Sequence, residues 1–229
     1  MRHLTHRSAP YRELFMRLFI LMFCIFLLTP LRPTSAHPHV WMDMTIEILF
    51  NEAGMVTGLR QTWLFDDYYS AFATEGMDLD GDGKPDPEKL EEIMKVNMEH
   101  LNEYGYFTKA RDGKNVLGLM PLTDKSTRML DNRLEMSFTT PFEKPVSPEG
   151  SNFSYAIFDP TYYVDMLHAE TENPVILSGS PAGCSYKIMP PNPDPSVVAQ
   201  AAMLDASMQG ETGLGSFFAE RVRLTCPEK

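Results

Sequence analysis

Alternating apolar and polar residues predict that the body of the chain begins with a β-hairpin. In residues 40–50 (VWMDMTIEILF) every second residue is apolar, which is the pattern of a strand with one buried face. Residues 51–54 (NEAG) are typical of a turn, and residues 55–65 (MVTGLRQTWLF) are predicted to form the returning strand. A sheet is therefore expected to start near Val40.

Helical spacing replaces this alternation after the hairpin. Asp66 and Asp67 precede aromatic residues and predict the start of a short helix. Residues 87–104 carry apolar side chains at helical spacing, with Glu in the first turn. The apolar residues of this stripe are Leu90, Ile93, Met94, Met98 and Leu101. A second, Ala-rich helix is predicted over residues 196–208, after a proline-rich linker.

Short strands bounded by Gly, Pro, Asn or Asp are predicted for the rest of the chain. They cover residues 106–109, 116–122, 127–130, 133–140, 153–158, 162–167 and 184–189. Regular short strands with polar turns favour antiparallel pairing. The predicted fold class is α+β: a mainly antiparallel β-sheet or sandwich with an inserted acidic loop and helix (residues 66–104) and a C-terminal helix.

The first 36 residues have the features of a signal peptide. Four arginines precede an apolar run at residues 18–31, and small residues follow at 34–36. The run is shorter than the about 20 apolar residues of a membrane span. We expect cleavage after Ala36, export to the periplasm, and a single soluble domain over residues 37–229; an uncleaved anchor is the alternative.

Charge excludes some classes of partner. The 229 residues carry a net charge of -11, and removal of residues 1–36 takes away five Arg and one Glu, leaving 15 basic and 30 acidic residues and a net charge of -15. Such acidity argues against nucleic acid as a partner, because phosphate neutralisation requires excess basic residues. The chain is 43% hydrophobic and 22% charged, which argues against intrinsic disorder.

Two cysteines remain after cleavage, Cys184 and Cys226. In an oxidising compartment, two such residues most often form one structural disulfide. A redox or metal-binding thiol pair is the alternative, but the C-x-x-C spacing is absent.

The predicted mature N-terminus begins with two histidines. Residues two apart on a strand share a face, so His37, His39, Trp41 and Asp43 are expected to lie opposite the apolar stripe. Imidazole and carboxylate groups suit zinc, nickel, cobalt or copper. Pro38 has no amide proton, which excludes square-planar binding through the amide of the second residue. The alternative is that the histidines only cap a strand.

Further ligands are sought among the few remaining polar candidates. Asp66 follows the second strand and is a candidate oxygen ligand, and Asp159 is a candidate to orient a ligating imidazole. His168 is a candidate ligand, whereas His100 lies near the end of the long helix and is expected at the surface. Each aspartate is equally suited to a helix cap or a turn.

An acidic loop resembles a calcium-binding loop. Asp at positions 1, 3 and 5 and Gly at position 6 match the calcium-loop pattern, but Lys89 occupies position 12, where a bidentate Glu is needed. The candidate residues are Asp78, Asp80, Asp82, Lys84 and Asp86. A structural calcium ion is expected here, with a solvated acidic loop as the alternative.

Four segments together resemble a known family. They are HPHVWMD (37–43), WLFDDYYS (63–70), FDPTYYVDM (158–166) and FFAERVRLTC (217–226). Their order resembles the bacterial periplasmic family called domain of unknown function 1007, described as the periplasmic component of an uncharacterised ABC-type transport system. The resemblance covers the mature chain and implies a partner of an inner-membrane nickel/cobalt- or zinc-type permease. It maps family motif positions onto His37, His39, Asp66 and Asp159.

Three functional hypotheses follow. The first is a non-enzymatic periplasmic protein that binds zinc, nickel or cobalt at its N-terminal histidines and delivers it to a permease. The second is a copper-dependent oxidative enzyme that uses His37 as a histidine brace, with His168 or His100 as a third nitrogen ligand. The third is a non-catalytic adaptor with structural calcium only. The sequence lacks common hydrolase, nucleotide-binding and zincin motifs.

Overall fold

The computed structural model describes residues 15–19, 38–150, 152–204 and 210–228. The chain divides into two units, Met1–Thr34 and Ser35–Lys229. Residues 15–19 of the first unit are helical, and none of the described helices is both long and apolar enough to cross a membrane. The predicted cleavage site after Ala36 and the predicted ligand His37 lie outside the described residues.

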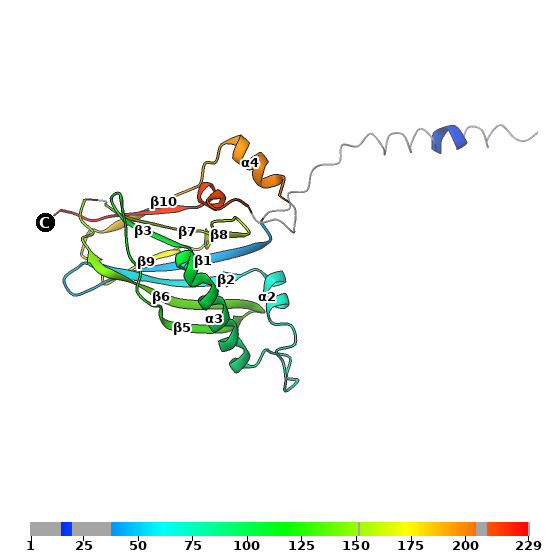
Figure 1. The fold of residues 1–229 in the computed structure, drawn as a ribbon, viewed down its shortest axis with the longest axis horizontal. Helices are drawn as coiled ribbons and strands as arrows, with labels where there is room; N and C mark the ends of the chain where they lie inside the picture. Colours follow the sequence, from blue (N-terminus) through cyan, green and yellow to red (C-terminus); the bar gives the residue numbers. More distant parts are fainter. Residues whose placement is uncertain (1–14, 20–37, 151, 205–209, 229) are drawn as a thin grey trace, which may run out of the picture. The chain divides into compact units, whose positions relative to one another are not determined.

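The second unit contains a six-stranded sheet built around the predicted hairpin (Figure 1). Its order is β5-β6-β2-β1-β8, and β9 also pairs with β1. These strands are β5 (Thr123–Leu130), β6 (Arg133–Val146), β2 (Val56–Phe65), β1 (Val40–Phe50), β8 (Val164–His168) and β9 (Val175–Ser178). Most pairs are antiparallel, but β1 pairs in parallel with both β8 and β9. The first strand is therefore central.

A second, five-stranded sheet is antiparallel throughout, in the order β10-β11-β7-β3-β4. Its strands are β10 (Ser185–Met189), β11 (Arg221–Thr225), β7 (Phe153–Ile157), β3 (Thr108–Asp112) and β4 (Asn115–Val116). The α+β class and the mainly antiparallel pairing predicted from the sequence are confirmed.

One hydrophobic core joins the two sheets. Alternation buries Val40, Met42, Met44, Ile46 and Ile48 of β1, as predicted, in a cluster that also contains residues of β7 and β11. Burial of these side chains removes apolar surface from water, which is the main stabilising contribution to such a fold.

A buried glutamine links the sheets by polar contacts. The Nε2 atom of Gln61 (β2) donates to Thr108 Oγ1 (β3) at 2.8 Å and to Thr140 Oγ1 (β6) at 2.7 Å, and Trp63 Nε1 donates to Gln61 Oε1 at 3.1 Å. Since the Gln61 side chain is fully buried, these bonds offset the cost of its desolvation.

Helices lie between and beside the strands. They are α2 (Asp67–Ala73), α3 (Pro87–Leu101), the 3-10 helix η1 (Asn102–Phe107), α4 (Pro195–Ala202) and the 3-10 helix η2 (Leu214–Phe217). In α3 the predicted stripe is on the inner face, where Leu90, Met94 and Met98 are buried. Asn97 contacts the Met136 sulfur on β6 at 4.0 Å, so α3 packs against the six-stranded sheet.

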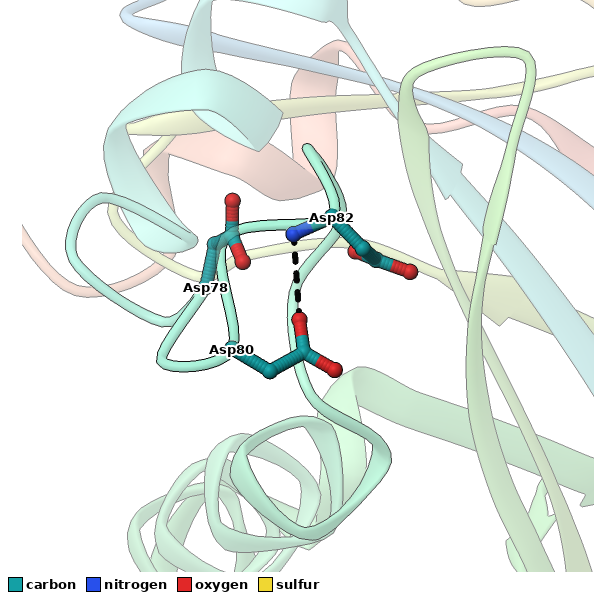
Figure 2. Close-up of side chains that lie close together, drawn as sticks. All are labelled: Asp78, Asp80 and Asp82. Carbon is teal, nitrogen blue, oxygen red and sulfur yellow. Dashed lines mark hydrogen bonds between the residues drawn. The ribbon is translucent and has the colours of Figure 1, made fainter.

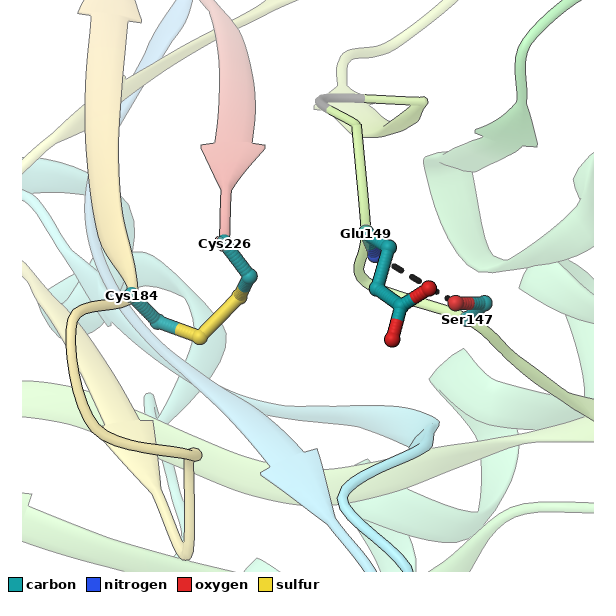
Figure 3. The surroundings of a disulfide bond; sticks show 4 residues. All are labelled: Ser147, Glu149, Cys184 and Cys226. Carbon is teal, nitrogen blue, oxygen red and sulfur yellow. Dashed lines mark hydrogen bonds between the residues drawn. A yellow bond between two sulfur atoms is a disulfide. The ribbon is translucent and has the colours of Figure 1, made fainter. Parts of the chain in front are cut away.

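The predicted disulfide between Cys184 and Cys226 is present (Figure 3). It joins the start of β10 to the residue after β11, across 42 residues of sequence. The backbone of Cys226 also forms an isolated parallel β-bridge with Glu149, whose amide donates to Ser147 Oγ at 3.3 Å. The disulfide therefore anchors the end of the chain to the second sheet and restricts the unfolded chain.

Some predicted boundaries were wrong. The strand predicted over 116–122 is only β4, Asn115–Val116, because Gly118 and Pro121 interrupt it and the segment crosses from one sheet to the other. The predicted C-terminal helix ends at Ala202 within the described residues. Strand β9 was not predicted, because residues 175–178 are too few to show a clear period.

Candidate functional site

The start of β1 holds His39 against a distant loop. The His39 and Val40 amides both donate to the Tyr163 carbonyl oxygen, at 2.9 and 3.3 Å. The His39 and Tyr163 rings lie together with centroids 5.0 Å apart and an interplanar angle of 37°. The imidazole is half-buried. His39 is thus fixed in both backbone and ring, just before the first strand enters the sheet.

Asp66 ties this segment to the start of α2. Its Oδ1 accepts from the Tyr69 amide at 2.8 Å, which is a helix N-cap bond, and its Oδ2 accepts from the Trp41 amide at 2.9 Å. The Asp66 amide in turn donates to the Trp41 carbonyl oxygen at 2.9 Å. The carboxylate predicted as a metal ligand therefore positions the strand two residues after His39.

Asp159 organises the loop that carries Tyr163. Its buried carboxylate accepts from the Thr161 amide at 2.8 Å, from Thr161 Oγ1, and from the amides of Tyr163 at 2.9 Å and Val164 at 3.1 Å. Charge-assisted bonds to three amides hold the turn closed. Because Tyr163 contacts His39, Asp159 is linked to the imidazole only through this turn.

The same turn is strained and tightly packed. Tyr162 has φ of 59°, in the left-handed region that a residue with a side chain seldom adopts. Its ring stacks on Phe218 with centroids 3.9 Å apart, and burial raises the pKa of Tyr162 to about 12. A Cβ at Gly215 would collide with the Asp159 carbonyl oxygen. Gly215 of η2 and Phe218, the residue after it, therefore pack closely against this turn.

Asp43 is engaged in an ion pair. Its Oδ2 lies 2.7 Å from Arg133 Nη2, and the guanidinium also donates to the carbonyl oxygens of Leu64 and Phe65 at 3.0 and 2.6 Å. Asp43 lies on the same outward face of β1 as half-exposed Trp41. This aspartate fixes the end of the β1–β2–β6 ladder, and one of its oxygens is occupied by the guanidinium.

His168 belongs to a buried cluster that the sequence analysis missed. Its Nδ1 and its backbone amide both lie 2.7 Å from Glu220 Oε2, and its Nε2 lies 3.0 Å from the Tyr155 hydroxyl. Both ring nitrogens are therefore engaged, and the residue pairs with Met44 in the middle of β1. The structure thus places His168 between the two sheets, with both ring nitrogens in hydrogen bonds.

Opposing effects set the protonation of this cluster. Burial raises the pKa of the Glu220 carboxyl. The side-chain and backbone hydrogen bonds from His168 together lower this pKa by more, so it lies below the ordinary value. Burial raises the pKa of Tyr155 strongly, which keeps its hydroxyl protonated. Burial, and then the charge of Glu220, raises the pKa of Asp165. The sequence contained a signal for this cluster: by strand alternation, Glu220 lies on the same inward face as Val222 and Leu224.

The acidic loop brings together three of its predicted side chains (Figure 2). Ligand oxygens of Asp78, Asp80 and Asp82 all lie within 4.8 Å of one another, and among the described residues this is the only such group of His, Cys, Asp or Glu. Asp78 accepts from the amides of Gly81 and Gly83 at 2.7 and 2.9 Å. All three carboxylates are exposed, as a solvated loop or an open cation site would require.

The remaining two members of the predicted set have different positions in the loop. Asp86 closes it, since its Oδ2 accepts from the Leu79 amide at 2.7 Å, whereas Lys84 contributes its amide, which donates to Asp82 Oδ1 at 2.8 Å. Neither belongs to the converging group.

An apolar cavity of about 220 Å³ adjoins the start of β1. Buried side chains of the six-stranded sheet line it, together with Val40 and Tyr163 on one side and Asn97 and His100 of α3 on the other. His100 thus approaches the residues beside His39 from the helix side.

Comparison with known proteins gives a family but no described activity. The model of the family "Protein of unknown function (DUF1007)" matches residues 21–226. An uncharacterized protein of Haemophilus influenzae is 28% identical over 193 residues, covering 83% of this chain and 91% of that protein. An uncharacterized 15.5 kDa protein of Spirochaeta aurantia is 27% identical over 106 residues, covering 46% of this chain and 74% of that protein. The chain therefore belongs to the DUF1007 family of proteins of unknown function.

Proposed function

We propose that the mature protein is a periplasmic, non-enzymatic binder of a divalent transition metal, zinc, nickel or cobalt, that acts with a membrane metal permease. His37 and His39 supply the imidazole ligands. The observation that carries the proposal is the fixed position of His39, whose amide and ring are both held by Tyr163 at the start of β1. A ligand that is already ordered loses little conformational entropy on binding.

The surroundings of His39 support metal binding in two ways. Asp159 holds Tyr163, which contacts His39, and Asp66 holds Trp41, two residues after His39, so both act around the imidazole as outer residues do in known metal sites. The net charge of -15 on residues 37–229 raises the concentration of cations near the surface. Neither carboxylate needs to touch the metal for its role.

A site with only a few protein ligands is better suited to deliver a metal ion than to store it. Two imidazoles at a chain start leave coordination positions open, and an acceptor protein can occupy them before the donor ligands leave. Of the other two histidines of the mature chain, His168 is engaged at both nitrogens and His100 lies on α3. The proposal therefore rests on the first two.

Metal titration tests the proposal. The exported protein is purified, its N-terminal mass is measured, and zinc, nickel and cobalt are titrated by calorimetry. We expect a chain that starts at His37 and an affinity that falls about a hundredfold in His37→Ala/His39→Ala, because ligand loss costs at least as much as loss of an orienting group. His100→Ala is the matched control and should retain the affinity.

Other outcomes would redirect the proposal. Unchanged affinity in the double variant would refute it and leave the adaptor hypothesis. Copper is titrated in the same way, and loss of copper binding in His100→Ala would favour the histidine-brace enzyme, which needs a third nitrogen ligand. The transport role is tested separately: cells that lack the protein should show altered metal content, and the double variant should fail to restore it.

A further inference from the structure

A cavity of about 760 Å³ lies away from the start of β1, between α3 and the edges of both sheets. Helix α3, the 3-10 helix η1, strand β3, residues 116–122 and the start of β5 contribute to its walls. Its volume falls within the about 300–1,000 Å³ of small-molecule sites. None of the residues proposed to bind metal lines it.

The charge at this cavity is opposite to that of the protein. Lys95 on α3, Lys109 on β3 and Lys125 on β5 line it, with Glu99 as the single carboxylate, so its ionisable lining carries a net charge of +2. Within the part of the chain that the structure describes, none of these lysines forms an ion pair. Three ammonium groups from three elements and one carboxylate therefore give this cavity an excess of positive charge, in a protein of net charge -11.

One wall of this cavity, formed by residues 116–122, is apolar. Residues 116–122, which cross between the sheets, place Val116, Leu117, Leu119, Met120 and Leu122 at the cavity. Val116 is 58% exposed and Met120 is 48% exposed. These side chains offer apolar surface that a ligand would remove from water.

We propose that this cavity binds an amphiphilic organic anion, a small molecule with an apolar body and a carboxylate, sulfonate or phosphate group. The lysines would bind the anionic group as point charges, and residues 116–122 would cover the apolar body. An inorganic anion would leave the apolar wall unused. A nucleic acid would be repelled by the remaining acidic surface. The inference is independent of the proposed metal site.

A pair of fluorescent probes tests both halves of the proposal. 8-Anilinonaphthalene-1-sulfonate and N-phenyl-1-naphthylamine share an apolar body, and only the first carries a sulfonate. We expect the wild-type protein to bind the sulfonate more tightly, and its affinity to fall with added salt. Equal affinity for the two probes, or no salt dependence, would overturn the anion assignment.

Substitutions then locate the binding. Lys95→Gln/Lys109→Gln/Lys125→Gln should weaken sulfonate binding about tenfold, as expected for three exposed charge contacts, and leave the neutral probe unaffected. Lys144→Gln/Lys187→Gln/Arg223→Gln removes the same charge outside the cavity lining and should change binding less than about twofold. Equal weakening by both triple variants would show a general charge effect and refute the site.

The apolar wall has its own test. Met120→Glu should weaken the binding of the sulfonate probe strongly, because it introduces a carboxylate into the wall. Met203→Glu adds the same charge at a residue that is 81% exposed and outside the cavity lining, and should have little effect. If Met120→Glu left sulfonate binding unaltered, the probe would bind at another place, such as the smaller apolar cavity beside β1, and the proposal would be refuted.

Discussion

The two candidate cation-binding regions differ in the origin of the contacts that shape them. The acidic loop is closed by bonds between residues two to seven positions apart. The start of β1 is held by Asp66, 25 residues from Trp41, and by Tyr163 in the turn before β8. The loop therefore needs only its own sequence to form, whereas the position of His39 depends on the folded domain.

The largest expected effect is on the free energy of unfolding, when a buried aspartate near β1 and an exposed aspartate of the acidic loop are removed in turn. Asp159→Ala leaves the amides of Thr161, Tyr163 and Val164 without their acceptor, and should lower the free energy of unfolding by about 3 kcal/mol. Asp78→Ala also removes two amide contacts, but at an exposed site where water replaces them, and should cost less than about 1 kcal/mol. Urea unfolding measures both, and equal losses would contradict the comparison.

Acid should weaken the long-range contacts near β1. The folded pKa of Glu220 is depressed, so its contribution is complete above the unfolded pKa and is lost as the pH falls through the folded pKa. Glu220→Gln should lower the free energy of unfolding by about 2 kcal/mol at neutral pH and flatten its fall in acid. Denaturant titrations at several pH values test this, and an unchanged pH slope would contradict it.

Asp165 gives the control of opposite sign. Its pKa is raised, first by burial and then by the charge of Glu220, so its ionised form is disfavoured in the folded state. Asp165→Asn should therefore increase the free energy of unfolding at neutral pH, measured in the same titrations. A decrease would contradict the assigned cause.

A smaller effect is expected at the two helix starts. Asp66 caps α2 through the Tyr69 amide and also binds the Trp41 amide, so Asp66→Ala should cost about 1 kcal/mol and speed hydrogen exchange at Trp41. Asp194 precedes α4 without a side-chain cap bond, and Asp194→Ala is the matched control. Urea unfolding and amide exchange would refute the distinction if both variants behaved alike.

The smallest expected effect is that of calcium on the acidic loop, which stays a prediction of its sequence pattern. The weakest sites of this open kind bind at about 1 mM, so calcium at about 1 mM should raise the unfolding temperature by only about 1 °C. Asp80→Asn should abolish the rise. Thermal unfolding with calcium and with magnesium measures it, and an equal response in the variant would identify the loop as a solvated turn.

Local patterns in the sequence explain why much of the fold was predictable. Alternation from Val40 to Ile48 identified the buried face of β1, and helical spacing identified α3. Cys184 and Cys226 had no other cysteine to pair with after cleavage. The three converging aspartates of the acidic loop are likewise close in sequence.

Remote pairing explains what was not predictable. The parallel partners of β1 are β8 and β9, and no short pattern specifies a strand partner more than a hundred residues away. His168 and Asp159 were expected near a metal as ligand and orienting residue. In the structure, His168 joins the sheets through Glu220 and Tyr155, and Asp159 holds the turn of Tyr163. Only the folded chain distinguishes these roles.

Nuclear magnetic resonance of the imidazole nitrogens during zinc titration tests the central claim most directly. The mature chain has four histidines, His37, His39, His100 and His168, and each gives separate nitrogen signals. The proposal predicts that the signals of His37 and His39 change together and saturate at one zinc ion per chain. It also predicts that His100 and His168 keep their signals. Changes confined to His100 or His168, or no saturable change at all, would contradict a metal site at the start of β1.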